Sequence, residues 1–322
     1  MRFAAFTQRA LRALPLWIGL NTLWADVTVR YQWDMKFSPS MPQQAQEMAK
    51  NQLAGREGMV LYFKDGKGYC KYGNLVTLTD YTNKQITLID AEHKSYATAG
   101  FPDFSDKVAA AAKAMMPSIP ASTQKALAET KTDFTTRSIE TSDVILGIQT
   151  DERESVFTIE IPGGTGMSSK MVMQFWTPKT SETMRNAGVR ELAGYKLYAN
   201  QFMNPMEGIR KMFDMIPGMA NNVKPMMEEF AGENLMMLRM KMSNYIQIPP
   251  EMLQKMGEHS PFGPNFDPNA PISESTLNLA ELSTAPVDAA IFQIPEGFQA
   301  APIEDLVKSA MAAMMPDVGH AK

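Results

Sequence analysis

The sequence predicts a mainly β domain of the α+β class, built on a strongly curved antiparallel sheet or half-barrel of about 10–11 strands. Three observations lead to this fold class. Apolar and polar residues alternate in several segments, short turn sequences separate many of these segments, and helix-prone stretches interrupt the series at only a few points. We expect the inserted helices to lie over the concave face of the sheet, and a further helix to end the chain.

The first predicted strand covers residues 27–38. Six apolar residues alternate there with six polar ones, from Val27 to Phe37 on one side and from Thr28 to Ser38 on the other. A period of two over twelve residues indicates a strand with one face towards water. The connections that follow are short, and Asp65-Gly66-Lys67-Gly68 is typical of a hairpin. Further strands are predicted at 59–64, 69–72, 75–81, 85–90 and 95–98, as an antiparallel meander.

Helix-prone insertions at about 103–131 and 187–232 separate this meander from the later strands. Those strands are predicted at 132–141, 144–150, 156–161, 170–177, 235–242, 275–282 and 290–294. No strand–helix–strand alternation occurs, which argues against a parallel sheet. Residues 26–300 should therefore form one domain. The segment 301–322 reads as an amphipathic helix with a short tail, because Ile303, Leu306 and Val307 fall on one helical face.

Residues 1–25 have the pattern of a cleavable secretory signal peptide. Arg2, Arg9 and Arg12 precede the short apolar stretch 14–24, and Ala25 provides a small residue for cleavage. The alternative is a buried N-terminal helix. The apolar stretch is about half of the ~20 residues that span a bilayer, and no later segment is apolar enough. We therefore expect a periplasmic or secreted protein without a transmembrane segment in its mature chain.

Composition and motifs exclude several classes of function. The net charge is −4, and removal of the signal would leave 28 Lys and Arg against 35 Asp and Glu, which disfavours nucleic-acid binding. His93, His259 and His320 lack metal-ligand spacing, and no nucleotide-binding or hydrolase motif occurs. We expect no catalytic residues, metal or cofactor. Cys70 is the single cysteine, and it is either a small packing residue or a reactive thiol.

The sequence contains seven short motifs: Asn74–Asp80, Gln85–Asp90, His93–Tyr96, Ile145–Thr150, Gln174–Thr177, Pro286-Val287 and Phe292–Phe298. Together they resemble an uncharacterised family of exported bacterial proteins, a domain of unknown function. The fold of that family is similar to the periplasmic lipoprotein carriers and the outer-membrane lipoprotein receptor. The resemblance implies a half-barrel closed over helices, with acyl chains held in a concave apolar cavity. The receptor's lipid anchor has no counterpart here.

Methionine is unusually frequent, and 11 of the 27 methionines fall between Met203 and Met242. Methionine can fill an irregular core, or it can line an adaptable surface for flexible apolar ligands. Clustered thioethers can also hold Cu(I), but this region contains no His or Cys. If the Met-rich segment meets the sheet, a ligand would contact residues from three strands. The predicted ligand-lining residues are Tyr31, Trp33, Met171, Met173, Phe175, Met236, Leu238, Met240 and Met242.

Two classes of function remain open at this point. One is a non-enzymatic protein that binds a lipid, an acyl chain or another apolar ligand in a Met- and aromatic-lined cavity. The other is a structural or protein-interaction module of the cell envelope whose cavity is filled by its own helices. An open cavity would favour the first class, and helices packed flush against the sheet would favour the second.

Overall fold

A large sheet of 13 strands dominates the computed structural model, which confirms the mainly β prediction. The structure describes residues 25–41, 43, 46, 47, 50, 58–115, 130–160, 166–202, 224, 236–256 and 266–314. The strands are β1 (Val27–Phe37), β2 (Gly58–Lys64), β3 (Lys67–Tyr72), β4 (Leu75–Asp80), β5 (Gln85–Asp90), β6 (Ser95–Gly100), β7 (Thr132–Ile139), β8 (Val144–Ile145), β9 (Ile148–Glu160), β10 (Ser168–Pro178), β11 (Arg239–Gln247), β12 (Ser273–Ser283) and β13 (Gln299–Ala300).

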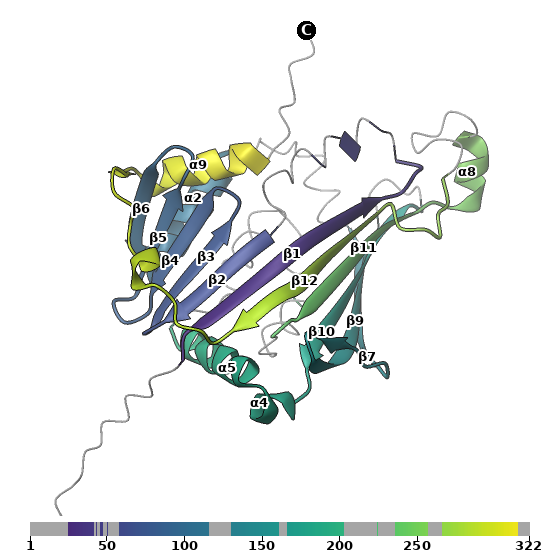
Figure 1. The fold of residues 1–322 in the computed structure, drawn as a ribbon. Helices are drawn as coiled ribbons and strands as arrows, with labels where there is room; N and C mark the ends of the chain where they lie inside the picture. Colours follow the sequence, from purple (N-terminus) through teal and green to yellow (C-terminus); the bar gives the residue numbers. More distant parts are fainter. Residues whose placement is uncertain are drawn as a thin grey trace, which may run out of the picture.

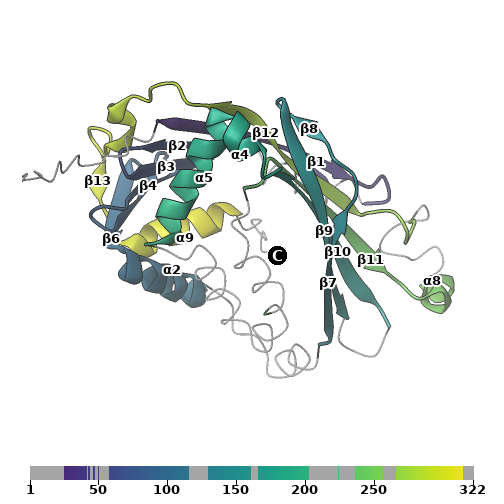
Figure 2. The same ribbon diagram turned by 90° about the horizontal axis from the view of Figure 1, so that it is seen from below.

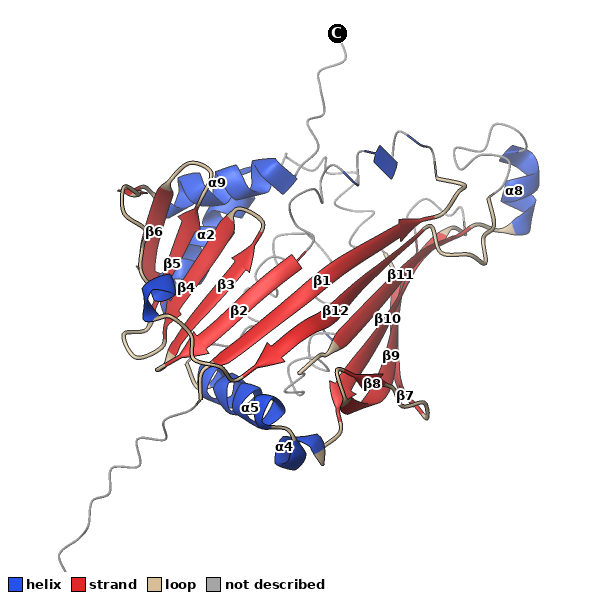
Figure 3. Cartoon of the chain, in the orientation of Figure 1, coloured by secondary structure: helices blue, strands red, loops and turns tan. Residues whose placement is uncertain are grey.

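The described helices are few and lie between or after the strands (Figure 3). They are α2 (Phe101–Met115), α4 (Glu182–Arg185), α5 (Ala187–Asn200), α8 (Pro250–Met256), the 3-10 helix η2 (Ala289–Phe292) and α9 (Ile303–Met314). The predicted helices after residue 103, after residue 187 and at the C-terminus correspond to α2, α5 and α9. Among the described residues, no helix combines the length and the apolar character needed to cross a bilayer.

The order of strands in the sheet shows which distant parts of the chain pair with each other. Neighbours follow the order β13-β6-β5-β4-β3-β2-β1-β12-β11-β10-β9-β7, and β8 pairs with β9 (Figure 1). The pairing of β1 with β12 joins the start of the domain to its end, from Thr28 opposite Ser283 to Phe37 opposite Ser273. This long-range pairing places two distant parts of the sequence at the centre of the sheet.

Tight turns make the meander β2–β6 antiparallel, as the sequence predicts. Asp65 and Gly66 both have a positive φ in the β2–β3 hairpin, and Gly66 accepts a hydrogen bond from Tyr81 N–H at 3.1 Å. Turns with positive φ match the right-handed twist of the strands that they join. In contrast to the prediction, one pair is parallel, because β13 returns from across the sheet to run alongside β6.

The sheet is bent, and α2, α5 and α9 lie on its inner side (Figure 2). Helix α5 packs on β1 and β12, and α9 packs on α2, β5 and β6. After β12 the chain crosses the other side of the sheet, where Ile294 and Phe298 pack against Val76, Leu78 and Ile89. Strands β4 and β5 are consequently covered on both faces.

Three strand predictions are wrong. The expected total of about 10–11 strands is too low, since the sheet has 13, although the segments predicted one by one also number 13. Residues 144–150 and 156–161 are not two strands, because β9 runs unbroken through the polar stretch 151–155 and pairs with β7 and β10. An Arg137–Glu154 ion pair at 2.7 Å supports a strand there without apolar alternation. Residues 290–294 are not a strand, because Asp288 caps η2 by accepting a hydrogen bond from Ala290 N–H.

Some predicted features lie outside the described residues. These are the signal segment up to residue 24, most of 43–54, residues 116–129 and nearly all of 203–235. Seven of the clustered methionines, from Met203 to Met227, belong to the last of these segments. The four that the structure describes are Met236, Met237, Met240 and Met242.

Candidate functional site

The nine predicted lining residues come from β1, β10, β11 and the residues just before β11, and they share one face of the sheet. Strand β12 lies between β1 and β11. Residues directly opposite each other on antiparallel strands point to the same face. One row across the sheet is Trp33, Leu277, Met240 and Phe175. The next row is Met35, Ser275, Met242 and Met173. Tyr31 and Met171 continue the same alternation on β1 and β10.

This face is the one that carries the helices, and we call it the inner face. Val27 and Val29 alternate in step with Tyr31 and Trp33, and both pack beneath α5. On the other side of β1, the registers of β2–β6 place Leu88 and Ala97 on the same face as Val27 and Val29. Both residues pack against α2 and α9. The inner face therefore runs continuously from β6 to β7.

Helix α5 covers one part of the inner face. Met236 and Leu238 pack in one cluster with Val189, Leu192 and Tyr195 of α5, and Tyr31 lies against this cluster. Leu238 has no exposed surface. Its N–H donates to the Trp176 carbonyl and its carbonyl accepts from Leu279 N–H, both at 2.8 Å. The protein itself thus occupies the space in front of Met236 and Leu238.

The remaining predicted residues form a second cluster, which we call the Met cluster. Phe157, Met173 and Phe175 are its buried centre, and Phe175 is only 3% exposed. The other described members are Phe134, Ile159, Met171, Met237, Met240 and Met242. In the described part of the chain, every member comes from β7, β9, β10 or β11 or from the residues just before β11. Trp33 lies in the same row as Met240, with Leu277 of β12 between them.

Tyr31 joins the two clusters through its polar end. Its hydroxyl donates a hydrogen bond of 2.7 Å to the Met237 carbonyl, 206 residues further along the chain. Burial raises the pKa of Tyr31 to about 12, so the hydroxyl keeps its proton and remains a donor. A buried tyrosine usually satisfies its hydroxyl in this way, which makes Tyr31 a fixed element of the wall.

The opposite face of the same strands is polar and crossed by ion pairs. Arg239 Nη1 lies 2.6 Å from the Asp143 carboxylate, and its guanidinium stacks over Trp176 at 5.3 Å. Lys241 Nζ lies 2.6 Å from Glu274. Since Arg239 and Lys241 alternate with Met240 and Met242, strand β11 separates a charged face from an apolar one.

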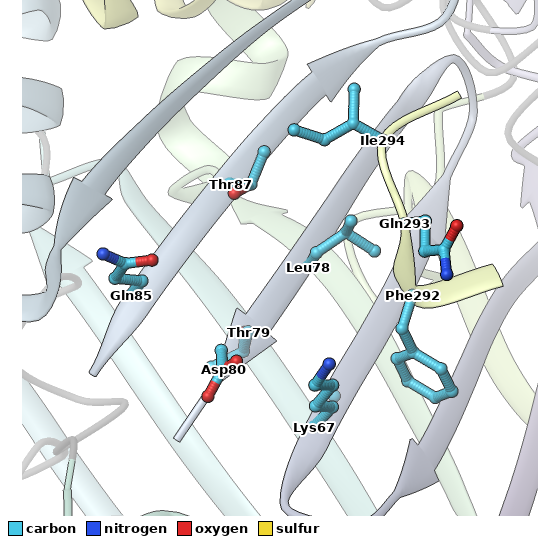
Figure 4. A pocket seen from close by; sticks show the side chains of 10 residues that line it. Lys67, Leu78, Thr79, Asp80, Gln85, Thr87, Phe292, Gln293 and Ile294 are labelled. Carbon is cyan, nitrogen blue, oxygen red and sulfur yellow. The ribbon is translucent and has the colours of Figure 1, made fainter. Parts of the chain in front are cut away.

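A pocket on the outer face was not predicted from the sequence. It has a volume of about 320 Å³ and lies where Phe292–Ile294 passes over β3–β5 (Figure 4). Lys67, Asp80 and Gln85 give it a mixed polar lining. The Asp80 carboxylate already accepts two hydrogen bonds from Asn83, at 2.8 and 2.9 Å. Its acidic group therefore serves the β4–β5 turn, and we do not place the functional site there.

Asp90, His93 and Ser309 lie together, but their geometry is not that of a hydrolase. Ser309 Oγ donates to Asp90 Oδ2 at 3.0 Å, and His93 Nδ1 is 2.8 Å from the same oxygen. A catalytic triad needs the carboxylate and the serine on different ring nitrogens. Here both lie beside Nδ1, with the serine at 3.4 Å. The contact instead ties α9 to the β5–β6 turn.

No described group of three His, Cys, Asp or Glu side chains could hold a metal ion. Comparison of the sequence with known protein families and with curated proteins finds no match. The inner face is therefore the candidate site on structural grounds alone. Sequence reasoning missed Ser275 and Leu277 as parts of it, although both alternate in step along β12 and could have been found from that period.

Proposed function

We propose that this chain is an exported, non-enzymatic protein that binds a lipid or another apolar ligand on the inner face of a half-barrel-like sheet. The Met cluster and Trp33 would form the contact surface. The observation that carries the proposal is the contrast along the inner face. Described helices pack on the parts around Leu238 and Leu88, whereas the described members of the Met cluster all come from strands or the approach to β11.

The chemistry of the Met cluster suits a flexible chain. Methionine is unbranched and polarizable, so it adapts to ligands of irregular shape. Burial of ten methylenes of an acyl chain contributes about 8 kcal/mol at ~0.8 kcal/mol per methylene. Ordering and association oppose binding by several kcal/mol, which leaves affinities in the micromolar range within reach for longer chains.

The test is a titration of the full chain with a fluorescent fatty acid or a solvatochromic dye. We expect saturable binding that Met242→Glu abolishes, because a charge would enter the apolar surface. Lys241→Gln is the matched control, since it changes the neighbouring residue on the outer face. Circular dichroism and melting curves must show that both variants fold. Absence of saturable binding to the unmodified chain would refute the proposal.

A second candidate is a structural or interaction module of the cell envelope. The packing of α5 on Met236 and Leu238 favours it, because the chain itself fills that part of the inner face. In this case apolar probes would not bind saturably, and a protein partner would be expected instead. The dye titration therefore separates the two candidates.

The proposal includes export, with cleavage after Ala25. Asp26 then becomes the first residue, and its carboxylate Oδ2 accepts 2.7 Å hydrogen bonds from Lys64 Nζ and Val287 N–H. Cleavage at this point would leave those contacts intact. N-terminal sequencing of protein from the periplasm or the medium should give Asp26 as the first residue. Intact Met1 on a cytoplasmic pool would contradict export.

A further inference from the structure

Two polar atoms on the inner face have no hydrogen-bond partner. Among the described residues, Trp33 Nε1 and Ser275 Oγ are both buried from solvent and unpaired. Ser275 is only 3% exposed as a whole. Buried polar groups nearly always find a partner, because an unpaired one loses its hydrogen bonds to water without replacement. Two such atoms near each other therefore require an explanation.

The two atoms come from adjacent strands and the same face. Trp33 is opposite Leu277, and Ser275 is two residues before Leu277 on β12. Such diagonal neighbours are about 7–8 Å apart at the backbone, within reach of a side chain as long as tryptophan. Both positions border the Met cluster, since Met240 faces Leu277 and Met242 faces Ser275.

Their immediate neighbours cannot satisfy them. The cross-strand neighbours of Ser275 are Met35 and Met242, and a thioether sulfur is only a weak acceptor. Leu277, opposite Trp33, has no polar side-chain atom. By contrast, Ser273 on the same face accepts a 3.1 Å hydrogen bond from Asn244 Nδ2. Among the described residues of this part of the inner face, Ser275 and Trp33 thus differ from Ser273 in lacking a partner.

The chemistry of the pair selects one type of ligand group. The indole N–H can only donate, and the serine hydroxyl can donate at the same time. A carbonyl oxygen has two lone pairs and can accept both hydrogen bonds. A carboxylate would bring a charge into a surface whose neighbouring side chains, Leu277, Met35 and Met242, are uncharged, and burial of an unpaired charge is strongly unfavourable.

We infer that Trp33 Nε1 and Ser275 Oγ bind the carbonyl oxygen of an acyl ester or amide whose hydrocarbon chain lies on the Met cluster. This inference rests on the proposed function and sharpens it. The protein would select acylated molecules over free hydrocarbons and ethers. Trp33 and Ser275 would fix the position of the ligand along the face, while the methionines adapt to its chain.

The test compares two ligands of equal chain length that differ in one carbonyl group. We would measure displacement of the solvatochromic dye by 1-monolauroyl-glycerol, which is an ester, and by 1-O-dodecyl-glycerol, which is the matching ether. The full chain should bind the ester about threefold to tenfold more tightly, as expected for a net gain of one or two hydrogen bonds. Trp33→Phe and Ser275→Ala should remove this preference, so that the ester and the ether bind with similar affinity.

Ser273→Ala is the matched control, because Ser273 shares the strand and the face but already has a partner. It should retain the preference for the ester. Ser275→Ala should also leave the ligand-free protein at least as stable as before, since it removes an unsatisfied hydroxyl; a structural role for Ser275 would lower stability instead. Equal binding of ester and ether by the unmodified chain, or a preference that survives both substitutions, would overturn the inference while the proposed function stands. Binding of neither ligand would overturn both.

Discussion

The inner face is built in two different ways on its two flanks. On the flank of β5 and β6, the side chains are short and regular, with Ala97 and Ala99 beneath α2 and α9. On the flank of β9–β11, they are long, with Phe175, Met173 and Met242 in the Met cluster. Small side chains let a helix axis approach a sheet closely, whereas long unbranched ones fill variable space.

On the proposed function, this difference separates a permanent core from an adaptable ligand-binding surface. The flank of β5 and β6, which we call the alanine flank, packs against α2 and α9 of the same chain. Burial of its apolar area stabilises the fold. The long, unbranched methionine side chains of the Met cluster can adapt to different groups packed against them. Substitutions in the first flank should therefore reduce stability, and substitutions in the second should mainly reduce binding.

The largest loss of stability is expected from Leu306→Asp in α9. Leu306 is 2% exposed and packs in one cluster with Leu88, Ala97 and Ala111. An aspartate there would be a buried charge without a partner, so the free energy of unfolding should fall by about 3–5 kcal/mol. Urea unfolding would measure the loss. Lys308→Gln in the exposed part of the same helix is the control and should change stability by less than about 0.5 kcal/mol. An unchanged unfolding curve for Leu306→Asp would show that α9 is not part of the core.

The second comparison sets Leu238→Ala against Met242→Ala, two inner-face positions that are four residues apart. Leu238 is completely buried under α5, so its truncation should cost about 2–5 kcal/mol. Met242 is only partly buried, and its truncation should cost clearly less while weakening dye binding. Thermal and urea unfolding together with dye titration give both quantities. A reversed order of stabilities would remove the distinction between core and adaptable surface.

The fold could be predicted from the sequence where local signals and tertiary structure agree. Period-two alternation located β1, and the turn at Asp65-Gly66 located the β2–β3 hairpin. Strand β9 was divided in two because its polar middle lacks alternation, although cross-strand pairs with β7 and β10 hold it. The pairing of β1 with β12 depends on contacts between distant residues, which a local pattern cannot specify.

The candidate site could be predicted only in part. Alternation along single strands identified Trp33, Phe175 and Met242 as apolar positions, and the register places them on the same face. The cover over Leu238 depends on where α5 docks, which is a property of helix packing. Ser275 could not be recognised as a candidate binding residue from the sequence, because a single serine in a strand does not indicate a binding site until its cross-strand neighbours are known to be thioethers.

A third prediction concerns how closely α5 approaches the sheet, and it uses two glycines of the same helix. A Cβ on Gly188 would lie 2.8 Å from Leu282 Cγ, whereas a Cβ on Gly194 would meet nothing within 4 Å. Gly188→Ala should therefore destabilise by about 1–3 kcal/mol through overpacking. Gly194→Ala should stabilise by up to about 1 kcal/mol, because alanine favours helix. Melting temperatures of the two variants should shift in opposite directions, and a stabilising Gly188→Ala would show that α5 is not fixed against β12.

The smallest effect is expected from pH, and it tests how α9 is attached to the alanine flank. The Asp90 carboxylate raises the pKa of His93 above its usual value of about 6.5. Burial alone would raise the pKa of Asp90, but hydrogen bonds from His93 and Ser309 outweigh it and lower that pKa. The histidine contribution is therefore complete below pH ~6.5 and disappears as the pH rises through the pKa of folded His93.

The Asp90 contribution has the opposite dependence: it is present above pH ~4 and disappears as the pH falls through the lowered pKa. Between these limits both groups are charged and the attachment of α9 is strongest. The melting temperature should then decline slightly from pH 6 to pH 8, and His93→Gln should remove this part of the decline. Because His93 is largely exposed, solvent screens the pair and the change should be small.

Ser309→Ala is the complementary variant: it removes the direct bond from α9 to Asp90 but keeps the histidine, so the pH dependence should persist at a lower overall stability. If His93→Gln keeps the full decline, the pH dependence arises elsewhere, and His93 does not contribute to the attachment of α9.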